Sequence, residues 1–544
     1  MKLLPTTTLI ATQAAVFGIA ATAQAVTFNL VEATIPEIQE AFESDLLTSE
    51  ELVQLYLDRI EAYDNQGPTI NSFIELNPDA LEQARELDRE RDRTEARGPL
   101  FGLPVMLKDN IDTFDLPTTA GAILLEDSVP PDDAFITQQL REEGAIVLGK
   151  GNLTEWANFI AFDMPNGFSA LGGQTLNPYG PGTFDVGGSS SGPGAAVAAN
   201  LVTVAVGTET SGSILSPSSR NSIVGIKPTV GLVSRDGVIP IAASQDTAGP
   251  MARTVTDAAI LLGALTGVDS SDPATAASAG QFLTDYTPFL DPEGLEGARI
   301  GVFRNIFTSR LSPDELILAE TAFAELERLG ATVIDPVTIE SASEISGFDV
   351  LLYEFNDGVE NYLESLGPDA PADSLEDIIA FNRENPDERI PFGQGIFLLS
   401  EETGGDLSDP EYLEARATDI RLARTEGIDA LLEELELDAI LLPNNSEAGI
   451  GARAGYPSIT VPAGYGETGE PFGLTFLGDA FSEPELIQYA YAYEQGTLLR
   501  TPPESTPPLS GDTITVPEAD TATPLPILAL IGIGYRFLRR GASI

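Results

Sequence analysis

The chain of 544 residues contains no histidine and no cysteine. A Ser-His-Asp triad is therefore excluded whatever the fold, and so are a disulfide, a thiolate nucleophile and a metal site built on His or Cys. Carboxylate-only sites for a hard cation stay open, but no loop of the sequence has the spacing of one. We therefore predict no metal and no cofactor, and a serine hydrolase of this composition needs lysine or a carboxylate as its base.

Basic residues are scarce as well. The chain has 28 Lys and Arg against 84 Asp and Glu, a formal net charge of −56. Such a charge repels phosphate backbones and anionic lipid headgroups, which argues against a nucleic-acid partner and against acidic substrates. The acidity indicates either a well-solvated surface or adaptation to high salt. The lysines are so few that all can be named: Lys2, Lys108, Lys150 and Lys227.

A Gly- and Ser-rich stretch at 187–217 reads GGSSSGPGAAVAANLVTVAVGTETSGSILSP and places Ser189 and Ser213 at two turns. Glycine permits tight turns and leaves neighbouring backbone N–H groups free to face a developing oxyanion. From these residues alone, Ser213 is a nucleophile, part of a phosphate-cradling turn or a helix N-cap. Lys108 follows a short apolar run in GLPVMLKDN, where burial lowers the pKa of the amine and provides a neutral base. The alternative for Lys108 is a buried structural ion pair.

These segments carry a family resemblance. GLPVMLKDN, GGSSSGPGAAVAAN, GTETSGSILSPSS and VGIKPTVGL resemble, in order and spacing, the amidase signature family of Ser-Ser-Lys amidohydrolases. The resemblance extends over residues 31–503 through segments such as GKGNLTEWANF, SQDTAGPMARTVTDAA and AGYPSITVPAGY. GGQTLNPYG, GSSSG and GTETSGSI are most similar to the branch that contains the bacterial peptide amidases.

The resemblance implies a fold and a set of roles. The fold is a single large α/β/α domain around a mixed, mostly parallel central sheet. Ser213 matches the nucleophile, Ser189 the bridging serine that follows a cis peptide bond, and Lys108 the catalytic base. The implied oxyanion hole consists of the backbone N–H groups of Thr210, Ser211, Gly212 and Ser213.

Other residues of the motifs are assigned lesser roles. Ser190 and Ser191 are weaker candidates that make local hydrogen bonds, and Lys150 and Lys227 are predicted to be structural. The sequence departs from much of the family at three positions, which bear on substrate choice and leave the relay residues intact. These are Glu209, where Asp is frequent, Ser211, where Gly is frequent, and Leu215, where Arg is frequent. The peptide-amidase-like branch also has Glu at the first position and lacks the Arg at the third. At the position of Ser211 that branch usually has Asp.

The resulting functional hypothesis is an amidohydrolase that cleaves carboxamide bonds through an acyl-enzyme, with a small-molecule amide or a C-terminal peptide amide as substrate. Within enzymes, the alternative is an N-acyl amide hydrolase or an esterase that uses the same relay. Outside enzymes, the alternative is an inactive binding protein of the cell envelope. An amidotransferase role fits poorly with export, because tRNA is cytoplasmic and polyanionic.

Both ends of the chain suggest export. Residues 1–25 combine a lysine, an apolar stretch and an Ala-Gln-Ala ending, which is typical of a signal peptide; the alternative is a buried N-terminal helix. Residues 26–503 then form the amidase domain, and 504–523 a Pro/Thr/Ser-rich linker. Residues 524–544, an apolar run with a basic end, resemble a PEP-CTERM sorting tail, although a plain amphipathic tail is the alternative. We expect a secreted or envelope-associated protein whose tail is the substrate of an envelope sorting peptidase.

Hydrophobic periodicity predicts the elements around the motifs. It indicates two helices within 35–63, the second with a capping box formed by Thr48 and Glu51. Short apolar runs within 102–149, separated by a helical segment, predict parallel strands with crossovers. The acidic stretch 340–410 is either a pocket cover or a surface helical insertion. Further predictions are helices at 78–93, 135–143 and 312–329 and strands at 298–303, 332–334, 439–442 and 458–461.

Overall fold

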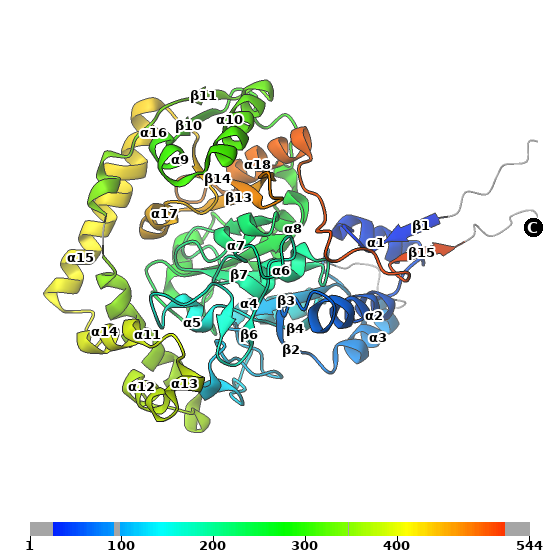
Figure 1. Ribbon diagram of the computed structural model, residues 1–544, viewed down its shortest axis with the longest axis horizontal. Helices are drawn as coiled ribbons and strands as arrows, with labels where there is room; N and C mark the ends of the chain where they lie inside the picture. The colour runs from blue at the N-terminus through cyan, green and yellow to red at the C-terminus, as the bar shows by residue number, and fades with distance from the viewer. Residues whose placement is uncertain (1–25, 92–97, 346, 517–544) are drawn as a thin grey trace, which may run out of the picture.

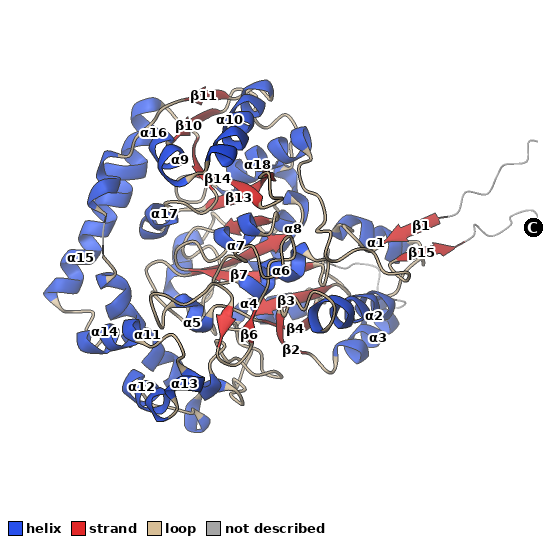
Figure 2. Ribbon diagram, in the orientation of Figure 1, coloured by secondary structure: helices blue, strands red, loops and turns tan. Residues whose placement is uncertain are grey.

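The computed structural model describes residues 26–91, 98–345 and 347–516. An 11-stranded sheet crosses the centre of the molecule with helices along its sides, in the order β11-β10-β12-β14-β13-β8-β9-β7-β3-β4-β2 (Figures 1 and 2). The α/β architecture around a mixed sheet is as predicted. The strands are β2 (Phe73–Leu76), β3 (Pro104–Lys108), β4 (Ile146–Gly151), β7 (Val204–Glu209), β8 (Val224–Lys227), β9 (Thr247–Ala252), β10 (Arg299–Val302), β11 (Thr332–Ile334), β12 (Ala439–Pro443), β13 (Ser458–Tyr465) and β14 (Pro471–Leu477).

The pairing of the strands corrects one part of the prediction, because the sheet is mixed but not mostly parallel. Parallel pairs lie in two blocks, β11-β10-β12 and β7-β3-β4. The strands between these blocks all pair antiparallel, and β2 adds an antiparallel edge. The alternation of strand and helix in the sequence reveals only the two parallel blocks, whereas the central pairing depends on contacts between strands distant in the chain.

The predicted helices are present with small shifts at their ends. Thr48 caps its helix, accepting a hydrogen bond from the backbone of Glu51 while the Glu51 carboxylate accepts one from the Thr48 N–H, as the capping box predicts. The helices are α1 (Ile35–Glu43), α2 (Ser49–Arg59), α3 (Ala80–Arg91), α4 (Phe135–Glu142), α5 (Glu155–Asn158), α6 (Ser191–Ala198), α7 (Leu215–Arg220), α8 (Val255–Leu265), α9 (Arg304–Arg310), α10 (Pro313–Arg328), α11 (Asp349–Ser365), α12 (Leu375–Glu384), α13 (Pro386–Arg389), α14 (Gly395–Thr403), α15 (Pro410–Ile420), α16 (Asp429–Leu435), α17 (Ala448–Ala454) and α18 (Glu483–Thr497).

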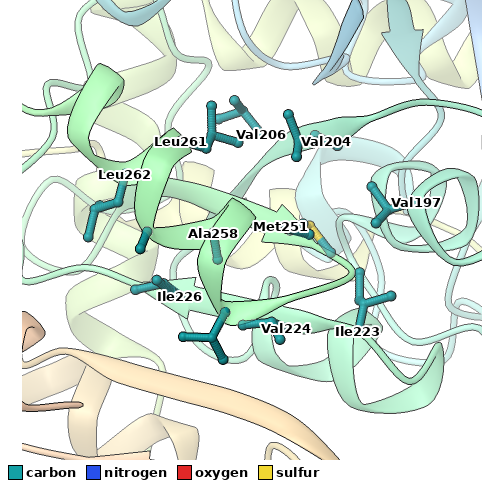
Figure 3. Packing of buried hydrophobic residues seen from close by; sticks show 14 of the residues in the cluster. Val197, Val204, Val206, Ile223, Val224, Ile226, Met251, Ala258, Leu261 and Leu262 are labelled. Carbon is teal, nitrogen blue, oxygen red and sulfur yellow. The ribbon is translucent and has the colours of Figure 1, made fainter. Parts of the chain in front are cut away.

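The main core lies where α6 and α8 pack on the central strands. Val197 of α6 and Leu261 of α8 are fully buried with Val204, Val224 and Met251 from three neighbouring strands (Figure 3). Burial of aliphatic side chains of this size contributes about 1.5 to 3 kcal/mol each. This packing fixes β7, and therefore the turn that follows β7 and carries Ser213.

The acidic stretch at 340–410 forms helices α11 to α14, at the edge of the molecule away from β1 and β15 (Figure 1). These helices share a second apolar core with the segment after β4. Trp156 packs edge-on against Phe397, with ring centroids 5.5 Å apart, and Phe355 lies 4.9 Å from Phe159. The insertion is thus anchored to the segment that follows β4.

The first part of the predicted linker corrects a second expectation. Residues 504–516 lie against the body of the protein, and β15 (Thr513–Val516) pairs antiparallel with β1 (Val26–Asn29). Asp512 forms an ion pair of 2.5 Å with Arg59 of α2, and both side chains are buried. Arg59 also donates to the backbone oxygens of Ala199 and Thr506. The composition of the linker does not reveal this contact, because the buried Arg59 guanidinium that binds the segment lies far away in the sequence.

The remaining sorting predictions lie outside the described residues. These are the signal peptide at 1–25, the rest of the linker and the tail at 524–544. Among the helices of the described ranges, none is both long and apolar enough to cross a membrane.

We predict that Asp512→Ala lowers the free energy of unfolding by about 3 to 5 kcal/mol, because it leaves the Arg59 guanidinium buried without its charged partner. Denaturant unfolding measures the change. The matched control is Glu50→Ala, which removes the exposed partner of Arg85 and costs at most about 1 kcal/mol. Equal small effects of the two substitutions would contradict a structural role for the Asp512 segment.

Candidate active site

Lys108 is the last residue of β3, a strand buried along its whole length. Its Nζ lies 2.7 Å from Ser189 Oγ, 2.9 Å from Thr208 Oγ1 and 3.2 Å from the Thr208 carbonyl oxygen. All three neighbours are neutral. No ion pair engages Lys108 in the part of the chain that the structure describes, so the structural ion pair weighed from the sequence is not present there.

The electrostatic surroundings of Lys108 suit a base. Burial lowers the pKa of its amine from the ordinary value of 10.5 to about 7, while the more distant charges of Asp246 and Glu209 act in the opposite direction. Desolvation therefore outweighs the two carboxylates. Near neutral pH a substantial fraction of Lys108 is uncharged and able to accept a proton.

Ser189 lies at the turn before α6, and the Gly188–Ser189 peptide bond is cis, as the resemblance implies. Its hydroxyl faces Lys108, and its carbonyl oxygen accepts a hydrogen bond of 3.0 Å from the Thr154 N–H. Ser191 makes the predicted local bond, to the Gly187 carbonyl at 2.6 Å, whereas Ser190 departs from the prediction and bonds to the Thr208 carbonyl on β7 at 3.0 Å. Of the three serines, Ser189 alone contacts the candidate base.

Ser213 lies in the turn between β7 and α7, with 8% of its surface exposed. The Ser190 N–H donates to the Ser213 carbonyl oxygen at 3.1 Å, so the two serine-bearing turns lie side by side. The Ser213 hydroxyl makes no hydrogen bond within the described residues. The contact between Ser189 and Ser213 that the relay requires is therefore not formed as a hydrogen bond here, although the segments that carry the two residues touch.

The predicted oxyanion hole needs one correction, at Gly212. Its N–H donates to the Glu209 carboxylate at 2.6 Å, and the same carboxylate accepts from the N–H groups of Ile214 at 2.8 Å and Leu215 at 3.0 Å. Gly212 is needed here for its conformation, with φ of +84°. Three predicted donors make no hydrogen bond among the described residues: the N–H groups of Thr210, Ser211 and Ser213.

The other two lysines of the described chain lie apart from the relay. Lys150 is buried, with Nζ 3.4 Å from the Asp109 carboxylate and 2.8 Å from Thr118 Oγ1. Lys227 donates to the Tyr456 carbonyl oxygen at 2.8 Å. Both contacts are those of structural residues, as predicted.

Three polar residues around Lys108, namely Asn110, Thr208 and Asp246, received no role from the sequence. The Asn110 amide donates to Thr208 Oγ1 at 3.0 Å and so holds the hydroxyl that Lys108 contacts. Asp246, in the segment just before β9, is the charged residue with the largest effect on the pKa of Lys108. Thr208 and Asp246 each lie within a quoted motif, GTETSGSI and SQDTAGPM, which was the available signal, but only the pairing of β7 with β3 and β9 brings them to Lys108.

Comparison with known proteins identifies the chain at the level of its family. The family model described as Amidase matches residues 51–453. The chain belongs to the amidase family. It is an amidase hydrolase, and among its relatives is a protein of Arabidopsis thaliana described as a probable amidase, 44% identical over 91% of this chain and 96% of the relative.

Solved structures agree with this assignment. The peptide amidase from Stenotrophomonas maltophilia is 47% identical, with a TM-score of 0.81 over 88% of this chain and 99% of that one. An amidase family protein from Bacillus anthracis is 42% identical, with a TM-score of 0.83 over 87% of this chain and 93% of that one. The amidase signature fold expected from the motifs is thereby confirmed.

We predict that Lys108→Ala and Ser213→Ala each lower kcat/KM for amide hydrolysis by several orders of magnitude, because each removes a group that the relay requires. The double variant should be no worse than the poorer single variant, since residues that act as a unit are not additive. Ammonia release measures turnover, and circular dichroism shows that the variants are folded. A double variant as active as the unmodified enzyme would exclude the relay.

The lowered pKa of Lys108 predicts a pH dependence. Only the neutral amine accepts a proton, so kcat/KM should rise as pH increases through about 7 and fall tenfold per unit well below it. A profile of kcat/KM between about pH 5 and pH 9 tests this. A rate that stays flat across this range would mean that Lys108 is not the titrating base.

Proposed function

We propose that this amidase cleaves carboxamide bonds by a relay from Ser213 through Ser189 to Lys108. The observation that carries the proposal is the contact of 2.7 Å between Lys108 Nζ and Ser189 Oγ at a buried amine with a pKa of about 7. A lysine in this state can take the Ser189 proton while Ser189 takes the proton of Ser213. Substrate binding closes the remaining gap between the two serine hydroxyls.

The chemistry then proceeds in two steps. The Ser213 oxygen attacks the amide carbonyl. The N–H groups of Thr210, Ser211 and Ser213 donate hydrogen bonds to the carbonyl oxygen, on which negative charge develops. Removing one such donor typically costs about 3 to 4 kcal/mol of transition-state stabilisation. The proton held by Lys108 returns through Ser189 to the leaving nitrogen, the C–N bond breaks, and water hydrolyses the ester formed on Ser213.

For the substrate, we propose an unsubstituted carboxamide on a neutral or cationic acyl group, such as a C-terminally amidated peptide, converted to the acid and ammonia. The similarity to a peptide amidase supports this class. Leu215, buried just after the nucleophile, places no charge there. The net charge of −56 favours cationic over anionic substrates, an effect that salt screens.

The substrate proposal is tested by specificity constants for a peptide amide, a simple aliphatic amide, an N-alkyl amide and a matched ester. We expect the highest kcat/KM for the peptide amide, and Ser213→Ala serves as the control for background hydrolysis. A higher value for the N-alkyl amide would assign the enzyme to N-acyl amide hydrolysis. A higher value for the ester would assign it to the esterases.

A further inference from the structure

Asp246 is a buried carboxylate that the relay does not use. It lies just before β9, with 8% of its surface exposed. One of its oxygens accepts a hydrogen bond of 2.5 Å from the Thr210 hydroxyl. The other accepts bonds of 2.8 Å from the backbone N–H groups of Ile241 and Ala242. A carboxylate with three donors is fixed in position, and it therefore fixes the hydroxyl that it holds.

Thr210 connects this carboxylate to the reaction. It is the first residue after β7, and its N–H is one of the three free donors of the proposed oxyanion hole. The hydroxyl and the N–H belong to the same residue, so anchoring the hydroxyl restricts the direction in which the N–H points. An oxyanion donor stabilises the transition state only when it is already directed at the developing charge.

Asp246 also acts electrostatically on Lys108. Among nearby charges, that of Asp246 has the largest effect on the pKa of Lys108, and that of Glu209 has the second largest. The guanidinium of Arg235 also acts on Asp246, but Arg235 is itself paired with Asp272 at 2.6 Å. From α11, Glu354 accepts the Ser244 N–H at 2.9 Å and does not bond to Asp246.

A cavity connects these groups to the surface. It measures about 330 Å³, and its lining includes Asp246, Arg235 and Tyr362. A much smaller pocket is lined by Asp246 together with Thr208 and Thr210. Asp246 thus lines both this cavity and the small pocket beside Thr210.

We propose that Asp246 is a positioning residue for the amide hydrolysis described above: it holds Thr210 so that its N–H faces the oxyanion, and its negative charge stabilises the ammonium form of Lys108. This inference rests on the proposed function. It assigns two separable effects to one side chain, an alignment that acts through Thr210 and an electrostatic effect on Lys108.

The alignment is tested by Thr210→Val, which removes the hydroxyl and retains the backbone N–H and the side-chain volume. We expect kcat to fall by about tenfold to a hundredfold with little change in KM, because the donor acts in the transition state. Thr210→Ser restores a hydroxyl and should recover most of the loss. The matched control is Thr203→Val, which removes another buried hydroxyl, bonded to Tyr56 at 3.2 Å, and should leave turnover unchanged.

The electrostatic effect is tested by Asp246→Asn. Removing the negative charge makes the ammonium form of Lys108 less favourable, so the acid limb of the kcat/KM profile should move to lower pH while kcat falls. A loss of activity without movement of the acid limb would overturn the electrostatic role. Equal kcat values for Thr210→Val and Thr210→Ser would overturn the alignment, and this measurement stands even if Asp246→Asn does not fold.

Failure of this inference can be distinguished from failure of the proposed function. If Lys108→Ala and Ser213→Ala abolish turnover while the Thr210 and Asp246 variants behave as the unmodified enzyme, the relay stands and Asp246 has no positioning role. If Lys108→Ala remains active, the relay itself is wrong.

Discussion

The amine of Lys108 is buried against three neutral oxygens, and the rest of the candidate site depends on this environment. An ammonium ion would be poorly solvated there, which is why its pKa falls to about 7. Lys150 shows the contrast, since it is equally buried but lies 3.4 Å from the Asp109 carboxylate. Burial lowers the pKa of Lys150 as well, but there the Asp109 carboxylate acts in the opposite direction and pairs with the amine, whereas no ion pair engages Lys108 among the described residues. In a chain without histidine, the buried amine of Lys108 is the candidate proton acceptor near neutral pH.

The sheet holds the groups around this amine. Parallel pairing with β7 brings Thr208 to Lys108, and the antiparallel pairing of β7 with β9 brings Asp246 to the same place. Glu209, at the end of β7, holds the following turn by accepting three backbone N–H groups. The Glu209 side chain thereby organises the turn that carries Ser213.

The sequence was sufficient for the parts of the site that lie within continuous motifs. Lys108, Ser189 and Ser213 could be named as candidates from their segments, and the helices could be predicted from periodicity and caps such as Thr48. Contacts between distant segments could not be predicted. The pair of Arg59 and Asp512 joins residues 453 positions apart, and no local pattern marks it. The hydrogen bond from the Gly212 N–H to the Glu209 carboxylate was also not predicted. A motif shows which backbone N–H groups lie near the serine, but it does not show which of them already donate to a side chain.

The scarcity of lysine allows a direct test of the central claim, that Lys108 is a neutral base. Lysine labelled with ¹³C at Cε gives few resonances in this chain, and the one that is lost in Lys108→Met can be assigned and titrated. A midpoint near pH 7 is the result that burial among neutral oxygens predicts. A midpoint near the ordinary value of 10.5 would show that Lys108 is charged at neutral pH and would contradict the proposed mechanism.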